Sequence, residues 1–392
     1  MSKSVQGCLD YGKAISFDEL VKAAKQCDNS VSWKSSVIKW MFNLYQNITE
    51  LRNRILNGTY HVSKYVKFEI TEPKRRIIYS TKFIDRVLQR SLCNNGLYHA
   101  LTKSLIYDNG ACQVGKGTSF TLKRFERMLH GYYEDNGHSN VGYAIKLDIH
   151  NYFGSTPHEL LKECVAKVVD EPHFKHHVFE IIDSFEDNRR ENEISKDPFG
   201  RRGIGLGSQV SQLLELLYLN DLDHYVKETL KIRQYIRYMD DMILFVKKKK
   251  DAVKIFADIK SKIEAKGLTL NPKSQIMPIQ NGIKFLKVNF RLTETGKVKK
   301  RVSNESISKE LRRISTLLWL FKNGNIDYDY LLMHFNSWVG HFKKRMASKQ
   351  FAVLNTHIKR TIERLGIDHD WIQNLRIKME FGDYVDGLNK DT

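Results

Sequence analysis

The sequence has few of the residues that mark secreted, fibrous or membrane proteins. Its 392 residues include only five cysteines and six prolines, and no two cysteines form a Cys-x-x-Cys pair. Reduced thiols are therefore expected rather than a disulfide framework or a zinc ribbon, and a collagen-like chain is excluded. No apolar run reaches the ~18 residues that a membrane helix needs, and the first residues lack a signal-peptide core. We expect a cytoplasmic protein with no membrane partner.

Acidic residues are outnumbered. The chain has 64 Lys and Arg against 45 Asp and Glu, for a formal net charge of +19. This surplus favours a polyanionic partner, because phosphate binding releases counterions; a general basic solubility bias is the alternative. Hydrophobic residues make up 41% of the chain, which is enough to bury a sizeable core. The length suggests two or three structural units.

Hydrophobic periodicity divides the chain into three predicted parts. Residues 1–60 have a helical spacing and predict a helical N-terminal extension. Residues 293–392 are predicted to be helical and basic. The part between them, 61–292, mixes both periodicities and predicts an α+β fold. Its expected elements are a hairpin within 61–80, strands at 141–149, 233–247, 274–279 and 283–291, and a long helix at 211–230.

Three carboxylates stand beside apolar strands, where acidic residues are unfavourable. Asp148 ends one predicted strand, and Asp240 and Asp241 occupy the tip of a predicted hairpin. If these elements are neighbours in one sheet, the carboxylates converge and require a cation. Mg²⁺ is the expected ion, with Mn²⁺ as an alternative, and two ions would activate a hydroxyl and stabilise a leaving phosphate. Ordinary turn aspartates are the other interpretation.

These motifs resemble those of reverse transcriptases. Residues 238–241 (YMDD) resemble the catalytic hairpin of that family, and 144–155 (AIKLDIHNYFGS) resemble its first catalytic strand and turn. Three further segments resemble the glycine-led helix beside the template and the next two palm motifs, namely 203–212 (GIGLGSQVSQ), 267–273 (GLTLNPK) and 284–288 (KFLKV). Order and spacing agree over about 65–292. The resemblance implies a right-hand polymerase with fingers and palm over 61–292 and a helical thumb over 293–392.

The resemblance also implies roles for single residues. Asp148 and Asp240 would be metal ligands and Asp241 a supporting carboxylate, all three catalytic. Phe153 would lie against the incoming sugar and exclude a ribose 2′-OH, unless it is only a core aromatic. The nucleotide would also be contacted by Lys74, Arg76, Leu206, Gly207 and Lys273. Nucleic acid would be contacted by Arg75, Lys116, Ser208, Gln209, Lys343, Lys344 and Arg345.

Two of these positions depart from the family pattern. Leu206 stands where many relatives have a glutamine near the incoming base, which puts ordinary copying fidelity in doubt. Lys273 is shifted relative to the lysine that usually follows the Leu-Asn-Pro motif, so its role as a general acid is open. Lys116 could equally lie in a plain surface loop.

The sequence thus predicts RNA-templated synthesis of DNA from dNTPs. The compact layout resembles bacterial reverse transcriptases, and we favour an antiphage-defence enzyme over a diversity-generating retroelement enzyme. The template would be a structured non-coding RNA, and a homo-oligomer or an accessory protein is left open. A non-catalytic RNA-binding module is the alternative from another class. It is disfavoured because such a module has no need of the costly trio Asp148, Asp240 and Asp241.

Overall fold

The computed structural model describes residues 9–29, 31–71, 75–185, 187, 189–205, 207–342 and 348–367. The chain divides into two compact units. One comprises Met1–Phe125 with Tyr143–Met277, and the other comprises Glu126–Gly142 with Pro278–Thr392. The domain limits expected from the sequence, 1–60, 61–292 and 293–392, stay a prediction. Within the described ranges, no helix is long and apolar enough to cross a membrane.

The N-terminal region of the first unit is helical, as expected. Its helices are α1 (Tyr11–Ala14), α2 (Phe17–Asp28), α3 (Ser35–Phe42) and α4 (Leu44–Leu56). Helix α2 begins where the Ser16 side chain accepts a hydrogen bond from the Glu19 N–H, and it buries Leu20, Ala23 and Ala24 at helical spacing. This face packs against α4 and against α5 (Phe83–Leu92).

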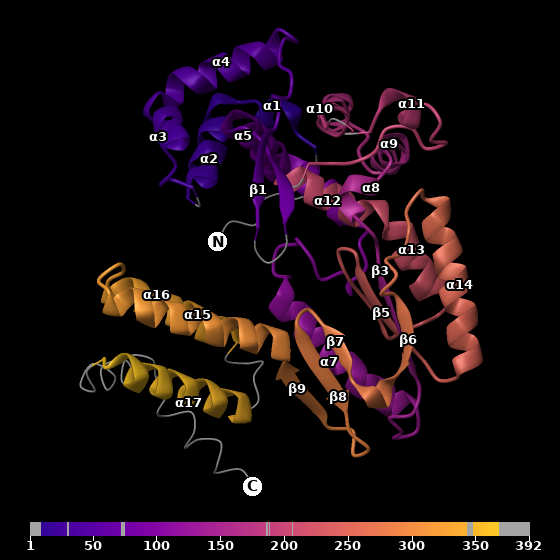
Figure 1. Cartoon of the computed structure of the whole chain (residues 1–392). Coiled ribbons are helices and arrows are strands. Elements are labelled where there is room, and N and C mark those ends of the chain that lie inside the picture. The colour runs from indigo at the N-terminus through magenta and orange to yellow at the C-terminus, as the bar shows by residue number, and fades with distance from the viewer. Residues whose placement is uncertain are drawn as a thin grey trace. The chain divides into compact units, whose positions relative to one another are not determined.

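A hairpin follows at the expected place (Figure 1). Strand β1 (Val66–Ile70) pairs antiparallel with β2 (Arg76–Ser80), so that Phe68 lies opposite Ile78. Beyond α5 the chain forms a π-helical turn, η1 (Cys93–Leu97), and then α6 (Tyr98–Thr102) and α7 (Thr118–Asp135). The hairpin predicted within residues 61–80 is thereby confirmed.

The centre of the first unit is a four-stranded sheet in the order β4-β5-β3-β6. Its strands are β3 (Tyr143–Asp148), β4 (Tyr235–Tyr238), β5 (Asp241–Val246) and β6 (Gln275–Pro278). β3 and β4 both pair antiparallel with β5, and side chains of all three strands are buried. The helices that follow in this part of the chain are α8 (Tyr152–Ser155), α9 (His158–Ala166), α10 (Pro172–Asp183), α11 (Glu191–Ile194), α12 (Gln209–Tyr218), α13 (Asn220–His224), the π-helical η2 (Tyr225–Thr229) and α14 (Lys249–Ala265), of which α14 packs against β3 and β5. This arrangement confirms the α+β class.

The long helix expected over 211–230 is interrupted. Helix α12 ends at Tyr218, and α13 and η2 follow as separate pieces. The guanidinium of Arg237 donates to the Leu216 carbonyl at 2.7 Å. In a continuous helix that carbonyl would pair with the N–H of residue 220. The expectation failed because apolar periodicity does not reveal a competing donor from a distant strand.

The second unit combines a small sheet with helices. Its elements are the part of α7 from Glu126 onward, η3 (Ile279–Asn281), β7 (Ile283–Phe285), β8 (Val288–Leu292), β9 (Val298–Val302), α15 (Asn304–Lys322), α16 (Tyr328–Phe342) and α17 (Ser348–Leu365). The single strand expected at 283–291 is a tight hairpin, because Leu286 and Lys287 both take positive φ angles, 46° and 67°. β9 pairs with β8, so the helical pattern expected from residue 293 begins only at Asn304.

Candidate active site

The sheet brings the three predicted carboxylates to one place. Asp148 is the last residue of β3 and lies directly opposite Asp241, the first residue of β5. Asp240 belongs to the two-residue turn that joins β4 to β5, since Tyr238 pairs with Asp241. The strand register therefore sets two of the carboxylates face to face, with the third beside them.

The electrostatics of this site are those of crowded negative charge. Burial raises the pKa of Asp241, and the charge of Asp148 raises it further. The ammonium of Lys146 opposes this rise, with its Nζ 3.7 Å from Oδ1 of Asp241. Lys146 lies two residues before Asp148 on the same face of β3. This cation was not among the predicted site residues, although its alternation with Asp148 along the strand was a usable signal.

The donor set fits a hard divalent cation. All three side chains offer carboxylate oxygens, which Mg²⁺ and Mn²⁺ prefer. No group of three or more histidine, cysteine, aspartate or glutamate side chains already arranged to hold a metal occurs in the described part of the chain. Asp148, Asp240 and Asp241 would therefore adjust their side chains around a cation, from backbone positions that the sheet holds.

The backbone of Asp148 is held from both sides. On one side β3 pairs with β5. On the other, the hydroxyl of Ser274 accepts from the Asp148 N–H at 3.1 Å and donates to its carbonyl at 3.2 Å. The Asn271 N–H donates to the same carbonyl at 2.7 Å. Ser274 follows the 267–273 motif by one residue and was not among the predicted site residues.

Phe153 lies on the short helix α8, five residues after Asp148. Its side chain is half-buried against the core, and its carbonyl accepts from the Ile204 N–H at 2.8 Å. The preceding turn is tight: Asn151 has a φ of 46°, and a Cβ at Gly154 would come within 2.4 Å of the Asn151 side chain. A side chain at position 154 would therefore require the Asn151 side chain to move, and the turn leaves the Phe153 ring partly exposed. The contact with a sugar stays a prediction.

An ionic cluster supports the same turn. Arg202 is bound by the Asp197 carboxylate, and its Nη1 donates to the Ser155 carbonyl at 3.1 Å and to the Gly267 carbonyl. The hydrogen bond from Arg202 is the main reason that the pKa of Asp197 lies well below its usual range. This pair ties the loop before α12 to the end of α8.

A buried glutamate lies beneath the site. Glu215 on α12 is fully buried, and its Oε2 accepts from the Thr156 hydroxyl at 3.0 Å. The Tyr152 hydroxyl donates to the Glu215 main-chain carbonyl at 2.6 Å. Burial raises the pKa of Glu215 to about 8, so this carboxyl is largely protonated at neutral pH. It joins both ends of the Phe153 turn to α12.

Lys116 faces its own loop. Its Nζ donates to the carbonyls of Tyr107 (2.9 Å) and Asn109 (3.0 Å) and lies over the rings of Tyr107 and Phe120. Burial lowers the pKa of this ammonium. The loop runs beside the turn between β4 and β5, since the Cys112 Sγ is 3.9 Å from the Met239 Sδ. Lys116 thus organises a loop next to the site, and template binding by it stays a prediction.

The start of α12 lies against the hairpin. Gly207 has a φ of 125°, and a Cβ there would approach the Tyr79 main-chain oxygen to 3.2 Å. Ser208 is buried, caps α12 by accepting from the Ser211 N–H at 3.3 Å and donates to Gln89. Its hydroxyl is therefore committed to the fold. The half-buried Gln209 follows it as the first residue of α12.

The remaining predicted residues are less informative. Arg75 is exposed and paired with Glu69, and Lys273 is exposed with its N–H donating to Asn271 Oδ1 at 3.1 Å. Arg76 begins β2. The other predicted contacts fall outside the described residues, namely Lys74, Leu206, Lys343, Lys344 and Arg345.

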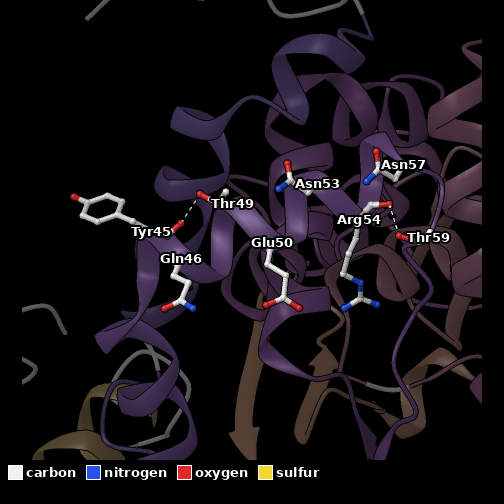
Figure 2. Close-up of a pocket in the computed structure, with 8 residues that line it drawn as sticks. All are labelled: Tyr45, Gln46, Thr49, Glu50, Asn53, Arg54, Asn57 and Thr59. Atoms are coloured by element: carbon white, nitrogen blue, oxygen red, sulfur yellow. Dashed lines mark hydrogen bonds between the residues drawn. The ribbon is translucent and has the colours of Figure 1, made fainter.

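An open pocket of about 530 Å³ lies elsewhere, along α4 (Figure 2). It is lined by Tyr45, Gln46, Thr49, Glu50, Asn53, Arg54, Asn57 and Thr59. None of the predicted site residues lines it. The three predicted carboxylates therefore lie at the sheet and not at this pocket.

Residues 72–290 match the family described as reverse transcriptase (RNA-dependent DNA polymerase). No curated protein matches the chain. Among solved structures, the chain is similar to apo telomerase from Candida tropicalis truncated from the C-terminal domain. The two are 16% identical with a TM-score of 0.43, over 65% of this chain and 60% of that one. The family match includes all three carboxylates and covers more than half of the chain.

Proposed function

Because the chain belongs to the reverse transcriptase (RNA-dependent DNA polymerase) family, whose right-hand polymerase fold its sheet and helices share, we propose that it copies RNA into DNA. One observation carries the proposal. Asp148 and Asp241 face each other in the register of β3 and β5, beside Asp240, inside the segment that matches the family. The partners of this reaction would be an RNA template, dNTPs and the DNA product.

The chemistry would be transfer of a nucleotidyl group. A 3′-hydroxyl, or a protein hydroxyl at initiation, attacks the α-phosphate of a dNTP; the new phosphodiester bond forms and pyrophosphate leaves. Asp148, Asp240 and Asp241 would hold two Mg²⁺ or Mn²⁺ ions, which supply the charge that activates the hydroxyl and stabilises the leaving phosphate. Phe153 would press against C2′ of the sugar. Lys74 and Arg76 would hold the triphosphate.

Loss of the carboxylates tests the proposal. Asp240→Asn combined with Asp241→Asn should abolish dNTP incorporation in a primer-extension assay, while the protein stays folded and still binds RNA. Removing like charges relieves repulsion, so the melting temperature should hold or rise. A matched control is Glu163→Gln with Asp170→Asn, which removes two exposed charges from the same unit. Incorporation by the Asp240/Asp241 variant at the rate of this control would refute the assignment.

For the biological setting, we propose a cytoplasmic enzyme of bacterial antiphage defence that copies a structured non-coding RNA. The support is the sequence resemblance to compact bacterial enzymes. Cells that carry the protein should reduce phage plaque numbers, and the Asp240/Asp241 variant should not. A diversity-generating enzyme would instead leave mutated DNA copies of one template, which sequencing of cellular DNA would show. A non-catalytic RNA-binding module would reduce plaque numbers equally as the wild type and as the Asp240/Asp241 variant.

A further inference from the structure

The turn that carries Asp240 has an unfavourable backbone. Of its two central residues, Met239 and Asp240, only Met239 has a positive φ, 57°. A positive φ at the first central position of a two-residue hairpin turn is normally the place of glycine, because a Cβ is crowded there. Such conformations persist where the surroundings hold them in place. Something must therefore restrain Met239.

The guanidinium of Arg237 contacts this residue directly. Arg237 lies on β4, two residues before Met239, and is 0% exposed. Its Nη1 donates to the Met239 carbonyl at 3.2 Å. Its Nη2 donates to the Leu216 carbonyl of α12 at 2.7 Å. One side chain thus joins the turn to the helix behind it.

The same guanidinium is anchored by a buried carboxylate. Nε of Arg237 is 2.8 and 2.9 Å from the two oxygens of Asp223, and Nη2 is 2.7 Å from one of them. Asp223 also accepts from the Tyr235 hydroxyl at 2.6 Å. Two rigid bonds to a carboxylate fix the plane of the guanidinium, so the direction of Nη1 is fixed as well.

Stability alone does not account for this ion pair. Taking two charges out of water costs so much that apolar side chains of similar volume often serve the fold as well or better. The arrangement does, however, use the geometry of arginine. Its acceptors, the Asp223 carboxylate and the carbonyls of Leu216 and Met239, require donors that point in different directions. Lysine offers a single nitrogen on a flexible stem and cannot reproduce this fork.

We propose that Arg237 is a positioning residue that holds the Met239 carbonyl, and through it the backbone of Asp240, in the arrangement needed for nucleotidyl transfer. This inference rests on the proposed polymerase function. Arg237 acts through the turn and touches no substrate. Its loss should therefore slow the chemical step without weakening nucleotide or RNA binding.

The main variant is Arg237→Lys, which keeps a positive charge beside Asp223. The control is Tyr235→Phe, which removes one hydrogen bond from the same buried cluster but leaves Arg237, Leu216 and Met239 connected. Three quantities are compared with the wild type: kcat and KM for single dNTP addition, the melting temperature, and hydrogen exchange of a peptide covering 238–241 in protein without metal or nucleotide.

We expect Arg237→Lys to lower kcat at least tenfold, to change KM less than twofold and to speed exchange in the 238–241 peptide at least fivefold. Tyr235→Phe should keep kcat within twofold of the wild type and leave this exchange unchanged. Its melting temperature should be similar to that of the wild type. If Arg237→Lys does not fold, Asp223→Asn replaces it, since the guanidinium then loses its charged anchor; exchange and kcat should change in the same directions.

Equal exchange and equal kcat in Arg237→Lys and Tyr235→Phe would overturn the inference and leave the cluster with a structural role only. A rise in KM at unchanged kcat would overturn it too, because that is the effect of lost binding. The exchange measurement does not depend on polymerase activity. A wild-type protein that extends no primer would refute the proposed function, and exchange would still decide whether Arg237 holds the turn.

Discussion

Replacing Phe153 with alanine distinguishes two roles of this residue, selection of the sugar and packing in the core. If the ring lies against C2′ of the incoming sugar, it leaves room for hydrogen but not for hydroxyl. Phe153→Ala should then raise the use of ribonucleotides relative to deoxyribonucleotides at least tenfold. That ratio corresponds to about 1.4 kcal/mol of differential transition-state energy. Binding of the metal ions by Asp148 should be unaffected.

The structure also sets the expected cost in stability. Replacing a fully buried phenylalanine with alanine lowers the free energy of unfolding by about 3–5 kcal/mol. Phe153 is only half-buried, and its main-chain bond to Ile204 survives the substitution. We therefore expect a loss of about 2 kcal/mol in the free energy of unfolding, scaled from the same range.

Single-nucleotide addition of each sugar type, together with a melting curve, tests both effects. Phe179→Ala is the matched control, because Phe179 is also half-buried against the same core but lies on α10. The control should lose comparable stability and keep the sugar ratio of the wild type. If Phe153→Ala lowers both activities together at an unchanged ratio, Phe153 is a core aromatic and the reasoning is refuted.

Three further predictions follow from the site. Ser274→Ala removes both side-chain hydrogen bonds to Asp148, and should cost about 1–2 kcal/mol of stability by melting and slow primer extension; an unchanged rate would mean that strand pairing alone holds Asp148. Asp197→Asn should cost about 2 kcal/mol at pH 7. The folded-state pKa of Asp197 is depressed, so its contribution is fully present above the unfolded value of about 3.9 and is lost only as pH falls through the lower folded-state value. Melting curves of both proteins at pH 7 and pH 3 should therefore show a smaller difference at pH 3 that does not vanish. Alanine in place of three predicted phosphate contacts, Lys343, Lys344 and Arg345, should weaken the salt dependence of template–primer binding. The slope of log K against log salt concentration, measured by salt titration, should decrease in magnitude by about 2–3.

Much of the first unit could be predicted because local signals agreed with the fold. The strand ending at Asp148 and the hairpin around Asp240 are short apolar segments bounded by polar residues, and both lie where expected. The hairpin at 283–291 was missed because Leu286 and Lys287 are not turn-forming residues. Their positive φ angles are imposed by the pairing of β7 with β8, which no local pattern reveals.

The carboxylates of the site were predicted, but their supports were not. Arg237, Glu215 and Ser274 act through contacts with residues far away in the sequence. An arginine in a strand and a glutamate in an apolar helix are conspicuous, and they signal a buried polar network. The partner of each depends on tertiary packing, so the sequence alone indicates only that partners must exist.

The pairing of β3 with β5 also determines what a register error during folding would do to this protein. Lys146 and Asp148 share one face of β3, and the buried Ile145 and Leu147 share the other. A slip of one residue would turn the charges into the core and the apolar side chains outward. Such a molecule would lose the whole sheet rather than persist as a folded but inactive enzyme. Slippage of β3 is therefore not expected to add a folded but inactive fraction to preparations of the protein.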